Sequence, residues 1–283
     1  MKPSEFHSLP DFLCIGAQKA ATSWLWAMLR QHPQIWMPPI KELHFFDHLY
    51  VPENRSWTHY HIKKGVNEAL KWHFNNNTSN LEHMKYLVDT AMVDPFTEDW
   101  YKSCFNRPAA QGKILGDITP EYSTLPDEGI EYVKRLLGPD LRIIYIIRNP
   151  LERALSQLRM NLSRRNKDSE GEDVWLNAAK EPVIAQRGDY ATYVGRWEKH
   201  FPESNILYLP YKMVRNSPEK LLKNVESFIG ASLNHSFNNM SNVVHKTKQI
   251  QVPSRVVDYL TTALEPQSRF LKGRFGESFF AET

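Results

Sequence analysis

Residues 12–24, which read FLCIGAQKAATSW, decide the fold class of this chain. The first five residues form a short apolar run that stops at Gly16, and such a run predicts a buried strand. From Thr22 onward, apolar residues recur at helical spacing. The stretch therefore predicts a strand, a loop of small residues and a helix in direct succession.

A second apolar run ends in an arginine. Residues 141–147 are almost continuously apolar, as expected of a central parallel strand that helices cover on both faces. Arg148 follows the run directly. Asn149 and Pro150 then have the residue types of a helix cap and a first helical position. Apolar residues recur at i, i+3, i+4 and i+7 from Leu151, so we predict a helix there.

A third strand and helix complete the pattern. Residues 205–209 read as a buried strand, and Ser217 and Pro218 open a helix that Gly230 closes. Strands that alternate with helices predict an α/β fold of three layers, in which helices flank a central parallel sheet. Ligands of such folds bind at the carboxyl ends of the strands, so the residues that follow each strand are the candidates for function.

The loop after the first strand has the chemistry of an anion cradle. Small side chains let the backbone approach a phosphate, the helix start favours negative charge, and Thr22 and Ser23 can donate hydrogen bonds. Lys19 adds a full positive charge. The loop is not a Walker loop, because no glycine directly precedes Lys19 and no hydroxyl directly follows it. The alternative is a plain connection that Thr22 or Ser23 caps.

Arg148 argues against a metal-dependent nucleotide site. A Walker-type NTPase carries an aspartate at such a strand end to hold Mg²⁺, whereas a cation there supplies the positive charge itself. Ser156 follows eight residues later and can reach the same anion if the two helices lie side by side. The alternatives are a plain strand-end charge for Arg148 and a surface serine. We therefore expect a phosphate site that needs no metal.

Composition and charge narrow the class of protein. The chain has 283 residues, 41% of them hydrophobic and 24% charged, which is ordinary globular usage. It lacks repeats and linker-like tracts, so we predict a single domain over residues 1–283. Its apolar runs fall far short of the roughly 20 residues of a membrane-spanning helix. A net charge of +3 suits an anionic ligand without indicating nucleic acid.

Two observations disagree about the cellular compartment. Cys14 and Cys104 suggest no disulfide framework, and the first eleven residues lack the apolar core of a signal peptide, so we expect a cytoplasmic protein. Glycosylation sequons leave a luminal protein as the alternative. They begin at Asn54, Asn76, Asn77, Asn161, Asn234 and Asn239.

Together, these residues resemble the sulfotransferases that use 3′-phosphoadenosine 5′-phosphosulfate (PAPS). In that family a Lys-x-Gly-Thr loop after the first strand binds the 5′-phosphosulfate, and an arginine with a serine eight positions later binds the 3′-phosphate. The resemblance implies a P-loop-like nucleotide-binding core. It also implies PAPS contacts, with Ala21 in place of the usual glycine, from Lys19, Ala20, Ala21, Thr22, Ser23, Trp24, Arg148 and Ser156.

Other stretches look like the heparan-sulfate and bacterial branches of that family. Residues 41–47, KELHFFD, resemble their catalytic segment, and residues 117–122, DITPEY, resemble their segment that ends in Thr-Pro-x-Tyr. The similarity covers most of the chain. In the late loop that closes over the nucleotide, Lys246 and Lys248 are candidate phosphate contacts, with solvated lysines as the alternative.

The resemblance implies in-line sulfuryl transfer to a hydroxyl or amine, with Glu42 as base and Lys19 stabilising the departing phosphate. We expect the apolar residues around Glu42 to raise its pKa, and the alternative is a surface carboxylate paired with Lys41. His44 shares a face with Glu42 only in an extended segment, where it could orient the acceptor or act as base.

The acceptor itself stays open. A carbohydrate or another small metabolite fits, and Trp57, Tyr60 and Trp72 suit either one. The oligomeric state cannot be read from the sequence. Two other functions compete: a nucleotide-dependent phosphotransferase, which Mg²⁺ dependence would reveal, and a non-catalytic protein that binds anions or glycans.

Overall fold

The computed structural model describes residues 9–76, 80–167, 169–233, 235–241 and 250–283. Within them a five-stranded sheet has the order β2-β3-β1-β4-β5, and every neighbouring pair is parallel. The three-layer α/β prediction is confirmed. The strands are β1 (Phe12–Gly16), β2 (Ile35–Trp36), β3 (Ile114–Ile118), β4 (Arg142–Ile147) and β5 (Ile206–Pro210).

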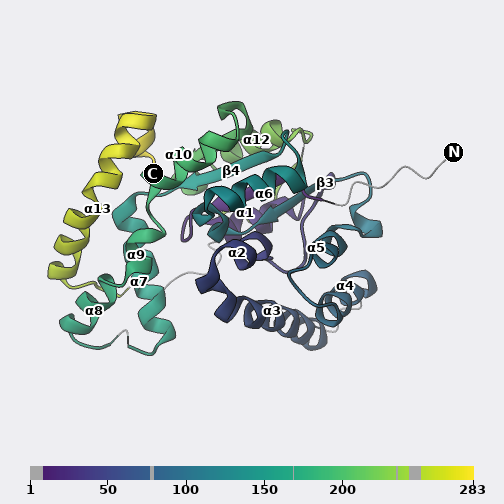
Figure 1. The fold of residues 1–283 in the computed structure, drawn as a ribbon, viewed down its shortest axis with the longest axis horizontal. Coiled ribbons are helices and arrows are strands. Elements are labelled where there is room, and N and C mark those ends of the chain that lie inside the picture. Colours follow the sequence, from purple (N-terminus) through teal and green to yellow (C-terminus); the bar gives the residue numbers. More distant parts are fainter. Residues whose placement is uncertain (1–8, 77–79, 168, 234, 242–249) are drawn as a thin grey trace.

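Helices cover both faces of this sheet and extend beyond it on two sides (Figure 1). They are α1 (Thr22–Leu29), α2 (Phe45–Tyr50), α3 (Arg55–Asn75), α4 (Leu81–Met92), α5 (Glu98–Phe105), α6 (Asp127–Leu137), α7 (Pro150–Arg164), α8 (Glu172–Ala179), α9 (Pro182–Gln186), α10 (Tyr190–His200), α11 (Met213–Asn216), α12 (Pro218–Ile229), α13 (Ser254–Phe275) and α14 (Glu277–Ala281).

The predicted elements form where their sequence signals stand. β1 is buried along its whole length, and β4 is buried from its second residue onward. The Asn149 side chain accepts hydrogen bonds from the backbone N–H groups of Leu151 and Glu152, which caps α7. Gly230 ends α12 in the left-handed conformation, at φ +80°. The cap residues therefore set these helix boundaries.

β3 is a strand that the sequence signals did not predict. Its residues, ILGDI, include a glycine and an aspartate, which are both rare in strands. Gly116 is required because a Cβ there would lie only 2.1 Å from Cζ of Phe12. Asp117 is only 1% exposed, and three hydroxyl groups hold its carboxylate. Tertiary packing therefore overrides strand propensity at both positions.

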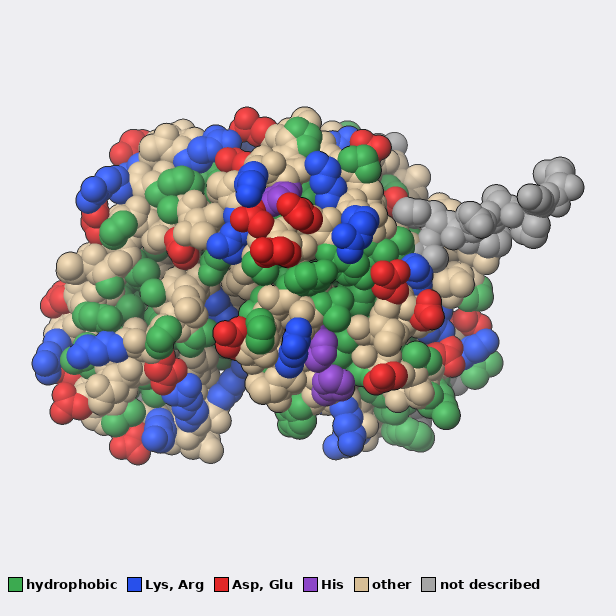
Figure 2. All heavy atoms as spheres, in the orientation of Figure 1, with side chains coloured by type: hydrophobic (Ala, Val, Ile, Leu, Met, Phe, Trp, Pro, Cys, Tyr) green, Lys and Arg blue, Asp and Glu red, His purple; other side chains and the backbone are tan. Residues whose placement is uncertain are grey.

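The space-filling view shows a notch at the lower edge of the molecule (Figure 2). β4 leads into α7 at its carboxyl end, and α7 and α8 lie on one side of the notch while α2 and α3 lie on the other. Lysine and arginine side chains gather on the α7 side (Figure 2). Because β1 and β4 are a parallel pair, the loop after β1 and the arginine after β4 lie at the same edge of the sheet.

Two further expectations can be compared with the described residues. Cys14 and Cys104 are both buried free thiols. Among the helices described, none combines the length and apolarity needed to cross a bilayer.

Candidate active site

The loop after β1 folds into a tight cradle. The Ala17 N–H donates to the carbonyl of Ile146 on β4, which fixes the loop to the neighbouring strand. Lys19 and Ala21 both adopt left-handed conformations, at φ +68° and +61°. Ala21 occupies the N-cap position of α1, and its methyl side chain cannot accept a hydrogen bond from the first turn. The first N–H groups of α1 are therefore presented to whatever lies in front of the helix.

The two predicted phosphate-binding stretches meet in space. Nη1 of Arg148 donates a 2.7 Å hydrogen bond to the carbonyl of Lys19, although 129 residues separate them. The Arg148 guanidinium also lies over the ring of Tyr211, 4.3 Å from its centroid. Tyr190 exchanges hydrogen bonds with the backbone of Arg148. These contacts hold the arginine against the cradle.

The Lys19 side chain points across the cradle toward α7. Its Nζ lies 3.7 Å from Sδ of Met160, one helical turn beyond Ser156. Burial, together with the positive charges of Arg148 and Arg164, lowers the pKa of Lys19 to about 8. A bound anion in the cradle offsets both effects, because its negative charge favours the charged form of Lys19.

The remaining predicted nucleotide residues surround this point. Thr22 and Trp24 are buried in the first turn of α1, and Ser156 is buried on α7. The Trp24 indole N–H donates to the carbonyl of Met240, so the start of α1 is tied to a late part of the chain. Lys246 and Lys248 lie outside the described residues.

The segment that carries Glu42 is bent by two left-handed residues. Glu42 and His44 have φ values of +67° and +53°, so the segment is not extended, which was the condition under which His44 would share a face with Glu42. The backbone N–H of Leu43 donates to the Thr119 hydroxyl, and the N–H of Phe45 donates to the Tyr122 hydroxyl. The bend nevertheless brings Nε2 of His44 within 3.5 Å of Oε2 of Glu42.

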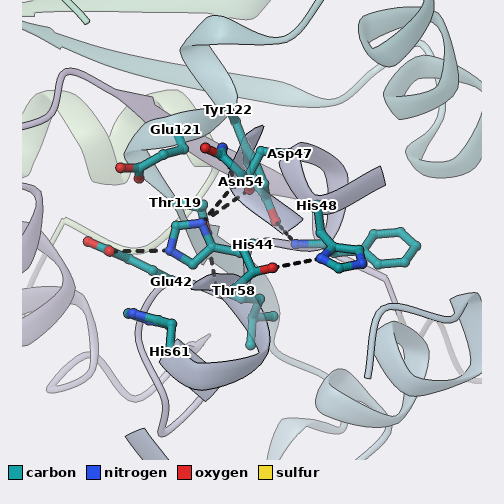
Figure 3. Close-up of polar contacts among 12 residues, drawn as sticks. Glu42, His44, Asp47, His48, Asn54, Thr58, His61, Thr119, Glu121 and Tyr122 are labelled. Atoms are coloured by element: carbon teal, nitrogen blue, oxygen red, sulfur yellow. Dashed lines mark hydrogen bonds and ion pairs between the residues drawn. The ribbon is translucent and has the colours of Figure 1, made fainter. Parts of the chain in front are cut away.

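Charges alternate along this segment (Figure 3). Glu42 pairs with the Lys41 ammonium and faces His44, and His44 Nδ1 donates to Asp47, 3.0 Å away. Asn54 donates a second hydrogen bond to the Asp47 carboxylate. His44 and Asp47 are completely buried. The sequence reasoning quoted Asp47 but gave it no role, although its position three residues after His44 at a helix start was a usable signal.

The protonation states differ from the sequence-based expectation. Burial would raise the pKa of Glu42, but the neighbouring cations Lys41 and His44 outweigh it and hold the pKa well below its usual range. The expected rise in the pKa of Glu42 is therefore wrong. Burial disfavours a charged His44, yet Asp47 and Glu42 raise its pKa to about 10. At neutral pH the pair is a carboxylate beside an imidazolium, so only Glu42 is able to accept a proton.

Glu121 is a second buried carboxylate that sequence reasoning did not single out. It is 5% exposed, and its Oε1 accepts from Gln18 beside Lys19 and pairs with Arg187, both at 3.1 Å. Burial raises the pKa of Glu121, which the charge of Arg187 partly offsets. Figure 3 places Glu121 and Glu42 next to His44. Glu121 therefore connects the cradle to the Glu42 segment.

A sequence model of the sulfotransferase family matches residues 10–235, which include the cradle, Glu42 and Arg148. This chain belongs to the sulfotransferase family. The match spans β1 through β5, so the sheet and the loops at its carboxyl edge are the part shared with other sulfotransferases.

Individual sulfotransferases resemble the chain at low identity. Mouse heparan sulfate glucosamine 3-O-sulfotransferase 3A1 is 23% identical over 228 residues, 78% of this chain and 46% of that protein. Mouse bifunctional heparan sulfate N-deacetylase/N-sulfotransferase 4 is 24% identical over 243 residues, 81% of this chain and 23% of that protein. The chain thus spans about half the length, or less, of the curated relatives that it matches.

A solved sulfotransferase from Alicyclobacillus acidocaldarius shares the fold, with a TM-score of 0.64 and 20% identity. The similarity covers 94% of this chain and 96% of the other.

The left-handed Ala21 yields a prediction about stability. A Cβ in this conformation costs roughly 1–2 kcal/mol, so Ala21→Gly should stabilise the sulfotransferase by about 1 kcal/mol despite glycine's greater freedom when unfolded. Urea denaturation measures the change. The matched control is Ala27→Gly in the interior of α1, which should destabilise by about 1 kcal/mol. Equal destabilisation by both substitutions would contradict a strained Ala21.

Proposed function

We propose that this protein transfers a sulfuryl group from PAPS to a hydroxyl or amine of a carbohydrate acceptor. The contact between Arg148 and Lys19 carries this proposal, because it unites cations from two distant motifs at one edge of the sheet. A nucleotide with a charged group at each end fits such a site. The family match and the heparan sulfate enzymes among the relatives support the reaction and the acceptor class.

The cradle residues are proposed to bind the phosphosulfate end of the donor. The N–H groups of the first turn of α1 and the hydroxyls of Thr22 and Ser23 can donate to its oxygens. Arg148 and Ser156 are proposed to bind the 3′-phosphate. The buried ring of Trp24 is proposed to pack near the adenine.

In the chemical step one bond forms, one bond breaks and one proton is transferred. The acceptor oxygen or nitrogen forms a bond to sulfur while the bond from sulfur to the phosphate oxygen breaks, and adenosine 3′,5′-bisphosphate leaves. Glu42 accepts the acceptor proton, and it is ionised at neutral pH because Lys41 and His44 stabilise its charge. Lys19 interacts more strongly with the phosphate as negative charge builds on it, which lowers the barrier.

The acceptor is proposed to enter next to α3. Trp57 on this helix packs edge-on against His44, with ring centroids 4.7 Å apart. An aromatic ring beside the base can stack on the apolar face of a sugar. Trp72 lies elsewhere, in a cavity of about 530 Å³ with Arg30 and His73, and Tyr60 is 68% exposed. Of the three aromatic residues predicted to suit an acceptor, Trp57 is therefore the one we assign.

The cytoplasmic location remains our prediction. One sequon that favoured the lumen is unsuited to a glycan in the folded protein, because Asn54 is 8% exposed and its amide donates to Asp47.

Nucleotide binding provides the direct test of the proposed function. Isothermal titration calorimetry should show that adenosine 3′,5′-bisphosphate binds, and Arg148→Ala should weaken the affinity at least about tenfold, because a charge-assisted contact to a phosphate is lost. Arg142→Ala, at the opposite end of β4, is the matched control and should bind like the wild type. A wild-type protein that ignores the nucleotide would overturn the proposal.

Substituting the base should separate chemistry from binding. Glu42→Gln should lower kcat by about 10²- to 10⁴-fold, since the amide cannot accept the proton, while nucleotide affinity stays unchanged. Transfer of radiolabelled sulfate from PAPS to a heparan sulfate oligosaccharide measures the rate. The exposed Glu53→Gln is the control. Wild-type turnover by Glu42→Gln would assign the proton to another group.

Lys19 should impose an alkaline limit on activity. Because its pKa is about 8 and only the ammonium form stabilises the phosphate, kcat/KM should be constant below pH 8 and should fall above it. Lys19→Ala should lower kcat more than about tenfold, a loss above about 1.4 kcal/mol. Lys19→Arg keeps its charge and should lose the alkaline decline. An unchanged decline in Lys19→Arg would show that another group titrates.

A further inference from the structure

The proposed base, Glu42, and two histidines beside it have the composition of a metal-binding cluster. Glu42, His44 and His61 each offer one ligand atom, and these atoms all lie within 4.8 Å of one another. Glu42 and His44 come from the bent segment before α2, whereas His61 comes from α3, and Figure 3 shows all three side by side. His61 lies outside the motifs that assigned the proposed function, so sulfuryl transfer leaves its position unexplained.

Both imidazoles have the outer contacts typical of metal-binding histidines. Such histidines usually donate their second ring N–H to a carboxylate or a backbone carbonyl, which fixes the nitrogen that faces the metal. His44 uses Nδ1 toward the Asp47 carboxylate, and His61 uses Nε2 toward the carbonyl of Lys41, 3.2 Å away. The opposite nitrogen of each ring is then the ligand atom, and on His44 the metal ion takes the place of the Nε2 proton, which is released to the solvent.

His44 supplies an independent observation. Its side chain is 1% exposed, and within the described part of the chain its Nε2 has only the ion pair with Glu42 and no short hydrogen bond. This nitrogen lies 3.5 Å from Oε2 of Glu42, close to the separation of about 3.3 Å between two ligands of a tetrahedral Zn²⁺ ion. A buried nitrogen aimed at a carboxylate oxygen and flanked by a second imidazole matches the ligand set that zinc prefers.

We propose that Glu42, His44 and His61 form a binding site for Zn²⁺ or a similar transition-metal ion, and that this ion inhibits the enzyme. Metal binding uses Oε2 of Glu42, the oxygen that faces His44, while Lys41 contacts Oε1. The negative charge of Asp47 behind His44 favours a cation there. A bound ion occupies the carboxylate that must accept the acceptor proton, so binding and catalysis exclude each other. Only this inhibitory consequence rests on the proposed function.

Direct titration tests the site without reference to activity. The full chain, freed of any polyhistidine tag and stripped with EDTA, is titrated with ZnCl2 by calorimetry. We expect one Zn²⁺ per chain, with the affinity lowered at least about tenfold in His61→Ala. His59→Ala removes an exposed histidine from the same helix and should bind like the wild type. Absence of zinc binding to the wild type, or equal affinity in His61→Ala and wild type, would overturn the proposal.

Cobalt provides a second readout that is insensitive to small losses of stability. Co²⁺ in a site with two imidazoles and a carboxylate should give visible d–d absorption in the wild-type protein, and Zn²⁺ should displace it. A wild-type spectrum like that of aqueous Co²⁺ would also overturn the site. Thermal melting of His61→Ala without metal verifies that the variant is folded.

Inhibition is measured separately, as formation of adenosine 3′,5′-bisphosphate from PAPS. Zn²⁺ should inhibit the wild type, and EDTA should restore the rate. For His61→Ala, with each rate compared with the variant's own zinc-free rate, the same degree of inhibition should need at least about tenfold more Zn²⁺. If the protein binds zinc but never forms the bisphosphate, the proposed function fails and the metal site stands. If it forms the bisphosphate at the same rate with zinc bound, the inhibitory role is wrong.

Discussion

The buried carboxylate of Asp117 organises the acceptor side of the site. It accepts hydrogen bonds from the hydroxyls of Tyr101, Tyr122 and Thr119, at 2.8–3.0 Å. Two of these hydroxyls in turn accept backbone N–H groups of the segment that carries Glu42. Without those donors a carboxylate in the core would be strongly unfavourable. One charge on β3 therefore fixes both the core behind α2 and the bend that exposes the proposed base.

Alternating charges then define the chemistry of that bend. Lys41 and His44 are cations, whereas Glu42 and Asp47 are anions, and each charge lies next to one of opposite sign. Burial alone would favour the neutral forms of Glu42 and His44, but their charged neighbours keep both ionised. As a result Glu42 stays a carboxylate, and His44 serves it as a fixed positive charge rather than as a competing base. The arrangement is pre-formed before any acceptor binds.

The sequence was sufficient for elements whose signals are local. Residues 141–147 are apolar in nearly every position, and Asn149 with Pro150 forms a cap, so β4 and the start of α7 could be predicted. β3 could not be predicted in this way. Gly116 makes room for the ring of Phe12 from β1, and Asp117 depends on hydroxyl groups that lie later in the chain or on α5. Strand propensity describes neither of these long-range contacts.

In the site, too, only the residues with local sequence signals could be predicted. Lys19 and Arg148 were found because each follows an apolar strand, and parallel strands place such residues at one edge. The relation between Glu42 and His44 was not, since it depends on two left-handed residues that sequence patterns do not reveal. His61 and Glu121 were missed because their neighbours in space are distant in sequence, and no alternation of apolar residues marks them.

The ring of Phe12 above Gly116 has a consequence at the far end of the sheet. Phe12 and Gly116 are direct partners in the parallel pair of β1 and β3. Sliding one strand along the other by a two-residue step would press the ring against a bulkier neighbour, so the aromatic group acts as an alignment pin. Both strands run in the same direction from that pair toward the Lys19 loop and Thr119. The pair of Phe12 and Gly116 therefore fixes the distance between the loop and Thr119, although neither residue contacts a substrate.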